Sequence, residues 1–140
     1  MNILKVLTER RIKGNIGEDG VAKYLKRNGY KILRRNYVEE GHEIDIIAEN
    51  KEYISFVEVK TRTKSAKNPY DLLPRDAVDL KKRKSIISSA RVFASFQNTD
   101  KKFRFDVAEV YLDENKKVLE INYIENAFTL NESTDHRYRK

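Results

Sequence analysis

The stretch Glu43-Ile44-Asp45-Ile46-Ile47 predicts a β-strand, and so does Phe56-Val57-Glu58-Val59-Lys60, which follows after a polar turn. Both stretches are rich in β-branched or aromatic residues, which favour strands. Residues 48–53 between them predict a hairpin turn built on Asn50. The two strands nevertheless carry three acids and one lysine, so the charges of this hairpin require an explanation.

Alternation assigns these charges to faces, because successive side chains of a strand point to opposite sides of the sheet. In the second strand we expect Phe56, Glu58 and Lys60 on one face, opposed by Val57 and Val59. In the first strand, Glu43, Asp45 and Ile47 oppose Ile44 and Ile46.

The distance between Asp45 and Glu58 depends on the register of the hairpin. If Glu49 pairs with Ile54, Asp45 lies directly opposite Glu58 with Cβ atoms roughly 5 Å apart, and a shift of two residues leaves them diagonal neighbours. Like charges this close destabilise a sheet unless a cation lies between them, which favours a divalent metal site. The alternative is a half-exposed hairpin whose outer face is polar for solubility.

Length and composition limit the class of protein. A chain of 140 residues is long enough for one domain with a real core, which we place at residues 1–130, followed by a disordered polar tail at 131–140. The absence of cysteine excludes disulfides and thiolate metal sites and fits a reducing compartment. No stretch resembles a signal peptide or a membrane span, so we expect a cytoplasmic protein without membrane association.

The charge of the chain points to a polyanionic partner. The formal net charge is +7 although the chain carries 22 acids, and the basic residues are clustered. The alternative is that these clusters are solvated helix faces and chain ends. We expect DNA as the partner, and a homodimer is compatible with the sequence. The basic residues expected to contact the nucleic acid are Arg62, Lys64, Lys82, Arg83 and Lys84.

The remaining pattern predicts helices around a mixed sheet. We expect a helix at residues 14–28, in which Glu18 lies on the apolar stripe that faces the sheet, although a helix glutamate can also swing to solvent. The other expected segments are an extended strand at 30–38, a loop at 61–76, a helix at 74–96, and strands at 103–110 and 118–124. The helix between the Glu58 strand and the 103–110 strand predicts a parallel crossover.

A helix with an acid, a strand with Asp45, and Glu58 followed two residues later by Lys60 resemble the core of the PD-(D/E)xK nuclease superfamily. At closer range the chain resembles the small bacterial YraN family, whose relatives include the archaeal Holliday junction resolvases. The blocks that carry this resemblance are Gly17-Glu18, Gly29-Tyr30, Glu43-Ile44-Asp45, residues 56–62, Ala77-Val78, Arg104-Phe105-Asp106-Val107 and Asn126-Ala127-Phe128. The resemblance implies an α/β fold with a restriction-endonuclease-like core, a mixed β-sheet flanked by helices.

The resemblance also implies roles for individual residues. Asp45, Glu58 and the backbone carbonyl of Val59 would bind Mg²⁺ or Mn²⁺, and Lys60 would face the scissile phosphate. Glu18 would assist as a further catalytic acid, and Glu43 would lie in the outer shell of the metal. We favour stabilisation of the transition state over a general-base role for Lys60.

Two functional hypotheses follow. The first is a metal-dependent endonuclease that hydrolyses phosphodiester bonds in DNA, with branched or damaged structures as candidate substrates. The second is a catalytically silent nucleic-acid-binding module that keeps the fold. The complete set of acids and lysine favours the first, because carboxylates that face phosphates repel them unless a cation intervenes.

Overall fold

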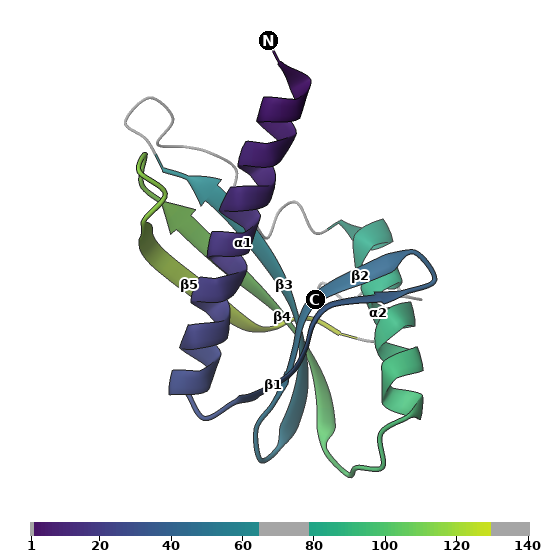
Figure 1. Ribbon diagram of the computed structural model, residues 1–140. Coiled ribbons are helices and arrows are strands. Elements are labelled where there is room, and N and C mark those ends of the chain that lie inside the picture. Colours follow the sequence, from purple (N-terminus) through teal and green to yellow (C-terminus); the bar gives the residue numbers. More distant parts are fainter. Residues whose placement is uncertain (1, 65–78, 130–140) are drawn as a thin grey trace.

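The computed structural model describes residues 2–64 and 79–129 (Figure 1). Its elements in chain order are α1 (Ile3–Arg27), β1 (Lys31–Glu39), β2 (His42–Glu49), β3 (Tyr53–Thr63), α2 (Leu80–Ser95), β4 (Lys102–Leu112) and β5 (Val118–Phe128). This order and the α/β class are those predicted from the sequence.

The strands form one five-stranded mixed sheet in the order β1-β2-β3-β4-β5. All neighbouring strands are antiparallel except β3 and β4, which run parallel along their whole length. Helix α2 connects these two strands, because a parallel pair needs a crossover rather than a tight turn. The predicted crossover is therefore confirmed.

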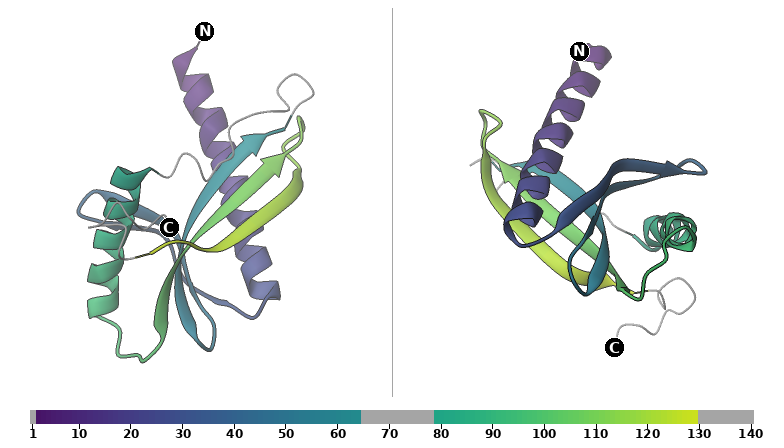
Figure 2. Two further views of the ribbon diagram at one scale, coloured as in Figure 1. Left: turned by 180° about the vertical axis from the view of Figure 1, so that it is seen from behind. Right: turned by 60° about the horizontal axis from the view of Figure 1, so that its bottom comes forward.

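The two helices lie on opposite faces of the sheet, as Figure 2 shows, and each covers its own apolar cluster. Phe56 packs in the cluster that contains α2, whereas Val57 and Val59 pack with α1, so the predicted alternation of β3 is confirmed. Ile44 departs from the predicted alternation of β2. It lies in the α2 cluster with Ile47, and Ile46 lies in the other cluster.

Helix α1 begins at Ile3 and not at Gly14, so the predicted start was wrong. The side chain of Asn2 caps the helix by accepting hydrogen bonds from the backbone N–H groups of Leu4 and Lys5. The early turns were missed because their apolar residues form no core-facing stripe: Ile3 and Leu4 are 68% and 70% exposed.

Several other boundaries also differ from the prediction. Strand β3 continues to Thr63, where a loop was expected from Thr61, and β5 continues beyond Ile124 to Phe128. Helix α2 begins at Leu80 behind an Asp79 cap, whose carboxylate accepts a hydrogen bond from Lys82 N. The rest of the predicted loop, the predicted start of α2 at Pro74 and the predicted tail at 131–140 lie outside the described residues.

Gly17 sets the distance between α1 and the sheet. A Cβ atom at this position would overlap the hydroxyl of Thr61 on β3. The helix backbone can therefore lie directly on β3 only because residue 17 has no side chain. This close approach brings Glu18, the next residue, to the part of the sheet that carries Asp45 and Glu58.

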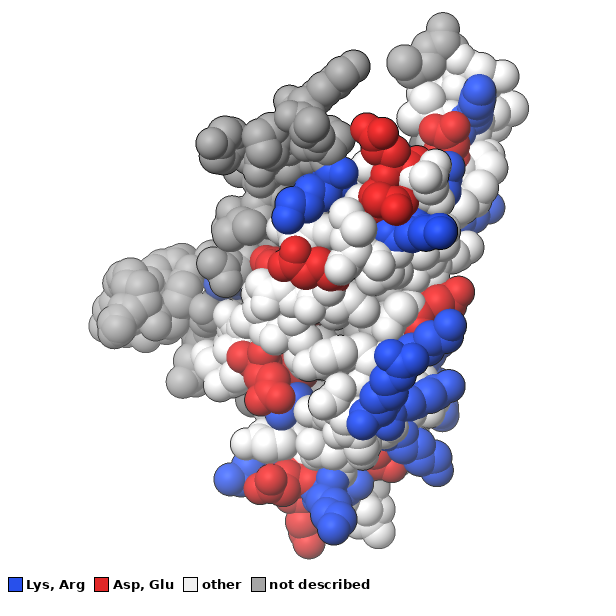
Figure 3. Space-filling view, turned by 90° about the vertical axis from the view of Figure 1, so that its left-hand side faces the viewer, with Lys and Arg blue, Asp and Glu red and all other residues white. Residues whose placement is uncertain are grey.

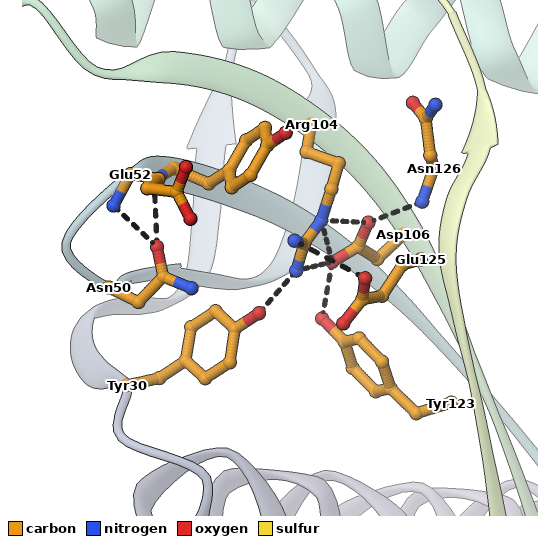
Figure 4. A network of polar contacts seen from close by, with 9 residues as sticks. Tyr30, Asn50, Glu52, Arg104, Asp106, Tyr123, Glu125 and Asn126 are labelled. Atoms are coloured by element: carbon orange, nitrogen blue, oxygen red, sulfur yellow. Dashed lines mark hydrogen bonds and ion pairs between the residues drawn. The ribbon is translucent and has the colours of Figure 1, made fainter.

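A buried polar network ties β4 and β5 together (Figure 4). The fully buried Asp106 carboxylate accepts hydrogen bonds from the Arg104 guanidinium at 2.9 to 3.1 Å, from the Tyr123 hydroxyl at 2.6 Å and from Asn126 N at 2.9 Å. Arg104 also donates to the hydroxyl of Tyr30. Burial, followed by the Asp106 charge, raises the pKa of Tyr123, so its hydroxyl remains a donor.

The network also explains an irregularity in β5. Asn126 has a φ angle of +56°, in the left-handed region, and the β4–β5 register shifts between Phe105 and Val107. The hydrogen bond from Asn126 N to Asp106 offsets the cost of this conformation, because it satisfies a backbone donor that the shifted ladder leaves unpaired.

We expect Asp106→Asn to lower the free energy of unfolding by about 3–5 kcal/mol, because it leaves the buried Arg104 charge without its partner. Urea denaturation at neutral pH measures the change. Glu125→Gln is the control: this carboxylate lies 3.6 Å from Arg104 Nη1 but its side chain is 63% exposed, so the change should stay below about 1 kcal/mol. A loss below about 1 kcal/mol for Asp106→Asn would contradict a structural role for the pair.

Candidate functional site

The candidate site lies where β2 and β3 separate. Their ladder runs from Glu49 opposite Ile54 to Ile46 opposite Val57, which is the first of the two registers considered from the sequence. The ladder ends one residue before Asp45 would pair with Glu58, and Figure 1 shows the β1–β2 hairpin turning away toward α2. Asp45 and Glu58 are therefore not directly opposite each other in the β2–β3 ladder.

Asp45 takes over the role of a strand partner at this point. Its Oδ2 atom accepts a hydrogen bond of 2.8 Å from Val59 N, which β2 no longer pairs. The N–H and C=O groups of one strand residue point to the same side, so the Val59 carbonyl also faces the side that β2 has left. Asp45 and this carbonyl therefore lie on the same side of β3.

Glu58 is held by two lysines from different elements. Its side chain is only 5% exposed, and its Oε2 atom lies 3.2 Å from Lys60 Nζ and 3.2 Å from Lys82 Nζ. Lys60 follows on the same face of β3, as predicted. Lys82 comes from the first turn of α2, so the helix that covers this face of the sheet supplies a second cation to the same carboxylate.

Glu18 approaches from α1, on the other face of the sheet. Its Oε1 atom is buried without a hydrogen-bond partner among the described residues, and Arg35 Nη2 lies 3.6 Å away. Burial raises the pKa of Glu18, partly offset by the positive charge of Arg35. The exposed Glu43 adds negative charge nearby, since it raises the pKa of both Glu18 and Asp45.

The environment of Asp45 strongly disfavours its charged form. Burial, followed by the negative charge of Glu58, raises the pKa of Asp45 to about 8, while the hydrogen bond from Val59 N opposes the shift. Glu18 and Glu43 add smaller effects in the same direction as Glu58. Four acids thus act on one another in this part of the fold.

These residues fit a hard divalent cation. The hydrogen bond from Val59 N uses Asp45 Oδ2 and both lysines contact Glu58 Oε2, so each carboxylate has a second oxygen outside these contacts. Glu18 Oε1 is buried without a hydrogen bond among the described residues, and oxygen ligands suit Mg²⁺ and Mn²⁺. No group of three or more His, Cys, Asp or Glu side chains within residues 2–64 and 79–129 is arranged to hold a metal. These ligands therefore suit an ion that keeps several of its water ligands, and they do not form a closed site made of protein ligands alone.

The basic residues predicted to contact nucleic acid lie near the start of α2 and at the end of β3. Lys82 turns to Glu58, Arg83 lies over the ring of Phe128 at 5.5 Å, and Lys84 is exposed. At the end of β3, Arg62 has a buried Nε atom without a hydrogen bond among the described residues, and Lys64 lies 3.7 Å from Glu120.

Two residues of the site were missed as its members. Lys82 was predicted only as a contact to nucleic acid, and Arg35, which lies 2.9 Å from Asp19 and next to Glu18, was assigned no role at the site. Both reach the acids through the tertiary fold, so no local spacing could have identified them.

The fold and site together define a small α/β protein in which acidic side chains and two lysines lie close together where strands β2 and β3 separate. The chain belongs to the uncharacterised protein family UPF0102, whose model matches residues 17–110. This segment contains Glu18, Asp45, Glu58 and Lys60 as well as Arg104 and Asp106. The resemblance to the YraN type is thereby confirmed at the level of the family.

Relatives match over most of the chain. A UPF0102 protein of Caldanaerobacter subterraneus subsp. tengcongensis is 43% identical over 121 residues, covering 85% of this chain and 96% of the relative. Proteins of the same family name from Clostridium acetobutylicum and Caldicellulosiruptor saccharolyticus are each 42% identical, covering 84% and 85% of this chain and 93% and 98% of the relatives. Among the described residues, no helix is both long and apolar enough to cross a membrane.

The titration of Asp45 predicts how stability depends on pH. The pKa of this carboxyl is about 8 in the folded protein against an ordinary value of 3.8, so the folded state holds the proton more tightly. Its contribution to stability is therefore complete below about pH 4 and is lost as the pH rises toward 8. We expect Asp45→Asn to match the parent near pH 4 and to be more stable by on the order of a few kcal/mol at pH 8.

Urea denaturation in EDTA across this pH range measures the effect. The exposed Glu114→Gln in the β4–β5 turn serves as a control and should keep the parent's pH dependence. An unchanged pH dependence in Asp45→Asn would show that this carboxyl is not the group responsible.

Proposed function

We propose that this protein is a metal-dependent phosphodiester hydrolase of the PD-(D/E)xK type that acts on DNA. The observation that carries the proposal is the cluster of Asp45, Glu58 and Lys60 where β2 leaves β3. The mixed sheet with a helix on each face is consistent with a restriction-endonuclease-like core, which agrees with the sequence resemblance.

Each residue has a role in this proposal. Asp45, Glu58 and the carbonyl of Val59 would hold Mg²⁺ or Mn²⁺, with Glu18 and Glu43 as further acids around the ion. Such an ion supplies a nucleophilic hydroxide and polarises a phosphate oxygen. Lys60, half-buried and held beside Glu58, would present its positive charge to the phosphate as negative charge develops.

One observation favours a second candidate function. The ion pairs from Lys60 and Lys82 already compensate Glu58 without any metal. A nucleic-acid-binding module without catalysis would need no more than this. The two candidates differ in whether a divalent ion displaces a lysine from Glu58, so they make opposite predictions for metal binding and cleavage.

Lys60→Ala should reduce cleavage roughly a hundredfold or more, because it removes one preorganised charge from the transition state. Affinity for Mn²⁺ should stay within a few fold, since a protonated lysine is not a metal ligand. Single-turnover cleavage at saturating Mn²⁺ on a panel of single-stranded, duplex, flapped and four-way-junction DNA measures the first quantity, and calorimetry the second.

Lys5→Ala, an exposed position far from the acids on α1, is the matched control and should cleave like the parent. Asp45→Asn and Glu58→Gln should each abolish Mn²⁺ binding. Full activity in Lys60→Ala, or unchanged Mn²⁺ affinity in both acid variants, would overturn the proposed site, whereas DNA binding without cleavage on any substrate would support the silent module.

DNA affinity should fall steeply with added salt and differ little between scrambled duplex sequences. The reason is that the predicted contacts, from Arg62, Lys64 and residues 82–84, would reach backbone phosphates, and nothing in the sequence resembles a base-reading helix. Fluorescence anisotropy between roughly 50 and 200 mM salt tests both statements. A shallow salt dependence with strong preference for one linear sequence would contradict them.

A further inference from the structure

A second polar site lies at the C-terminal end of α1, beyond Glu18. A shallow, open hollow of about 480 Å³ lies between the end of α1, the start of β1, the β2–β3 turn and the residues before β4. Its lining consists of Lys26, Gly29, Tyr30, Lys31, Glu49, Asn50, Lys51 and Lys101. We call it the lysine pocket. Figure 3 shows Lys and Arg side chains along the side of the molecule that α1 forms, and both basic and acidic side chains at its lower end.

The pocket holds more positive charge than its own contacts use. Four lysines line it against one glutamate, and within residues 2–64 and 79–129 only Lys101 among them is paired, with Nζ 2.9 Å from Glu49 Oε1. The exposed Lys26, Lys31 and Lys51 have no carboxylate within 4 Å among the described residues. Lys26 also complements the C-terminal end of the α1 dipole, but Lys31 and Lys51 lie outside the helix and have no such role.

The turn itself offers a further donor. Asn50 Oδ1 accepts hydrogen bonds of 2.9 and 2.7 Å from the backbone N–H groups of Glu52 and Tyr53, which fixes the side chain in the turn. Its Nδ2 group makes no hydrogen bond within the described residues, so it remains available. Ammonium and amide donors with few acceptors suit an anion with several oxygens, such as a phosphate group.

The position of the pocket relative to the acids is fixed by two elements. Along β2, Glu49 lies four residues from Asp45, or roughly 13 Å at 3.3 Å per residue. Along α1, Lys26 lies eight residues from Glu18, or roughly 12 Å at 1.5 Å per residue. Both spacings lie within the length of a few nucleotides of a nucleic-acid strand.

The edge of the sheet between the two sites is also basic. Strand β1 lies at this edge, begins at Lys31 in the pocket and reaches Arg35, which is 2.9 Å from Asp19 and 3.6 Å from Glu18. Because Glu18 and Asp19 already balance Arg35, the uncompensated positive charge along this path lies at Lys31, in the pocket.

We propose that the lysine pocket binds backbone phosphates of a nucleic-acid strand a few nucleotides from the phosphate that the acids would hold through a metal ion. This inference rests on the proposed function for the identity of the polyanion. The pocket anchors the strand without reading its sequence, because lysines contact phosphates as point charges. It differs from the basic residues predicted from the sequence, which lie on β3 and α2.

The test compares two double variants with the same change of charge. Lys31→Gln with Lys51→Gln removes two charges from the pocket, and Lys5→Gln with Lys117→Gln removes two exposed charges elsewhere. Binding of a fluorescent single-stranded 12-nucleotide DNA is measured in EDTA, so that no cleavage occurs. We expect the pocket variant to weaken binding about tenfold or more and to reduce the salt slope by about 1.4, the value for two single-strand contacts, with the control within about twofold of the parent.

Equal losses in both variants would overturn the proposal, because they would show a general effect of net charge. Backbone amide shifts of residues 29–31 and 50–51 on titration with inorganic phosphate give an independent measurement. Saturation by millimolar phosphate with no added affinity for the 12-nucleotide strand would identify a site for free phosphate instead and would also overturn it.

The outcome is separable from that of the proposed function. Pocket-dependent binding without cleavage in Mn²⁺ would leave the lysine pocket in place and reject the hydrolase. Cleavage in Mn²⁺ with equal binding by parent and pocket variant would do the reverse.

Discussion

The hydrogen bond from Val59 N to Asp45 determines the geometry of the site. Where β2 leaves β3, the backbone of β3 loses its partner, and a buried N–H without an acceptor is costly. The Asp45 carboxylate replaces the missing strand at 2.8 Å. An aspartate, unfavourable inside most strands, is thus suited to this position, and the separation of the strands leaves its second oxygen and the Val59 carbonyl unpaired by β2.

The rest of the site assembles around this point from both faces of the sheet. Gly17 allows α1 to lie close to β3 and so delivers Glu18, while α2 delivers Lys82 to Glu58. Without a bound cation the acids of the site repel one another. Burial and the negative charge of Glu58 raise the pKa of Asp45, and Glu58 is paired with Lys60 and Lys82. Both lysines contact Oε2 of Glu58, so a divalent ion that approached Oε1 would share this carboxylate with Lys82.

Much of this could be predicted from the sequence, because it depends on short-range geometry. Alternation placed Glu58 and Lys60 together, and the turn at Asn50 fixed the register of the hairpin, since Asn50 Oδ1 accepts from two backbone N–H groups of that turn. The early end of the β2–β3 ladder could not be predicted, because it follows from the packing of the β1–β2 hairpin toward α2. That packing also moves Ile44 into the α2 cluster against simple alternation. Lys82 and Arg35 reach the acids only through the tertiary fold.

The buried Arg104–Asp106 pair explains why two separate sequence blocks occur together. Arg104-Phe105-Asp106-Val107 and Asn126-Ala127-Phe128 were recognised as two blocks of one family, with no reason for their association. In the structure, Asp106 accepts the backbone N–H of Asn126, whose positive φ angle gives β5 its irregular end. Phe105 and Phe128 then stack with ring centroids 5.2 Å apart beneath α2. The network thus supports β4 and the face on which α2 packs, and it thereby helps to hold Lys82 within reach of Glu58.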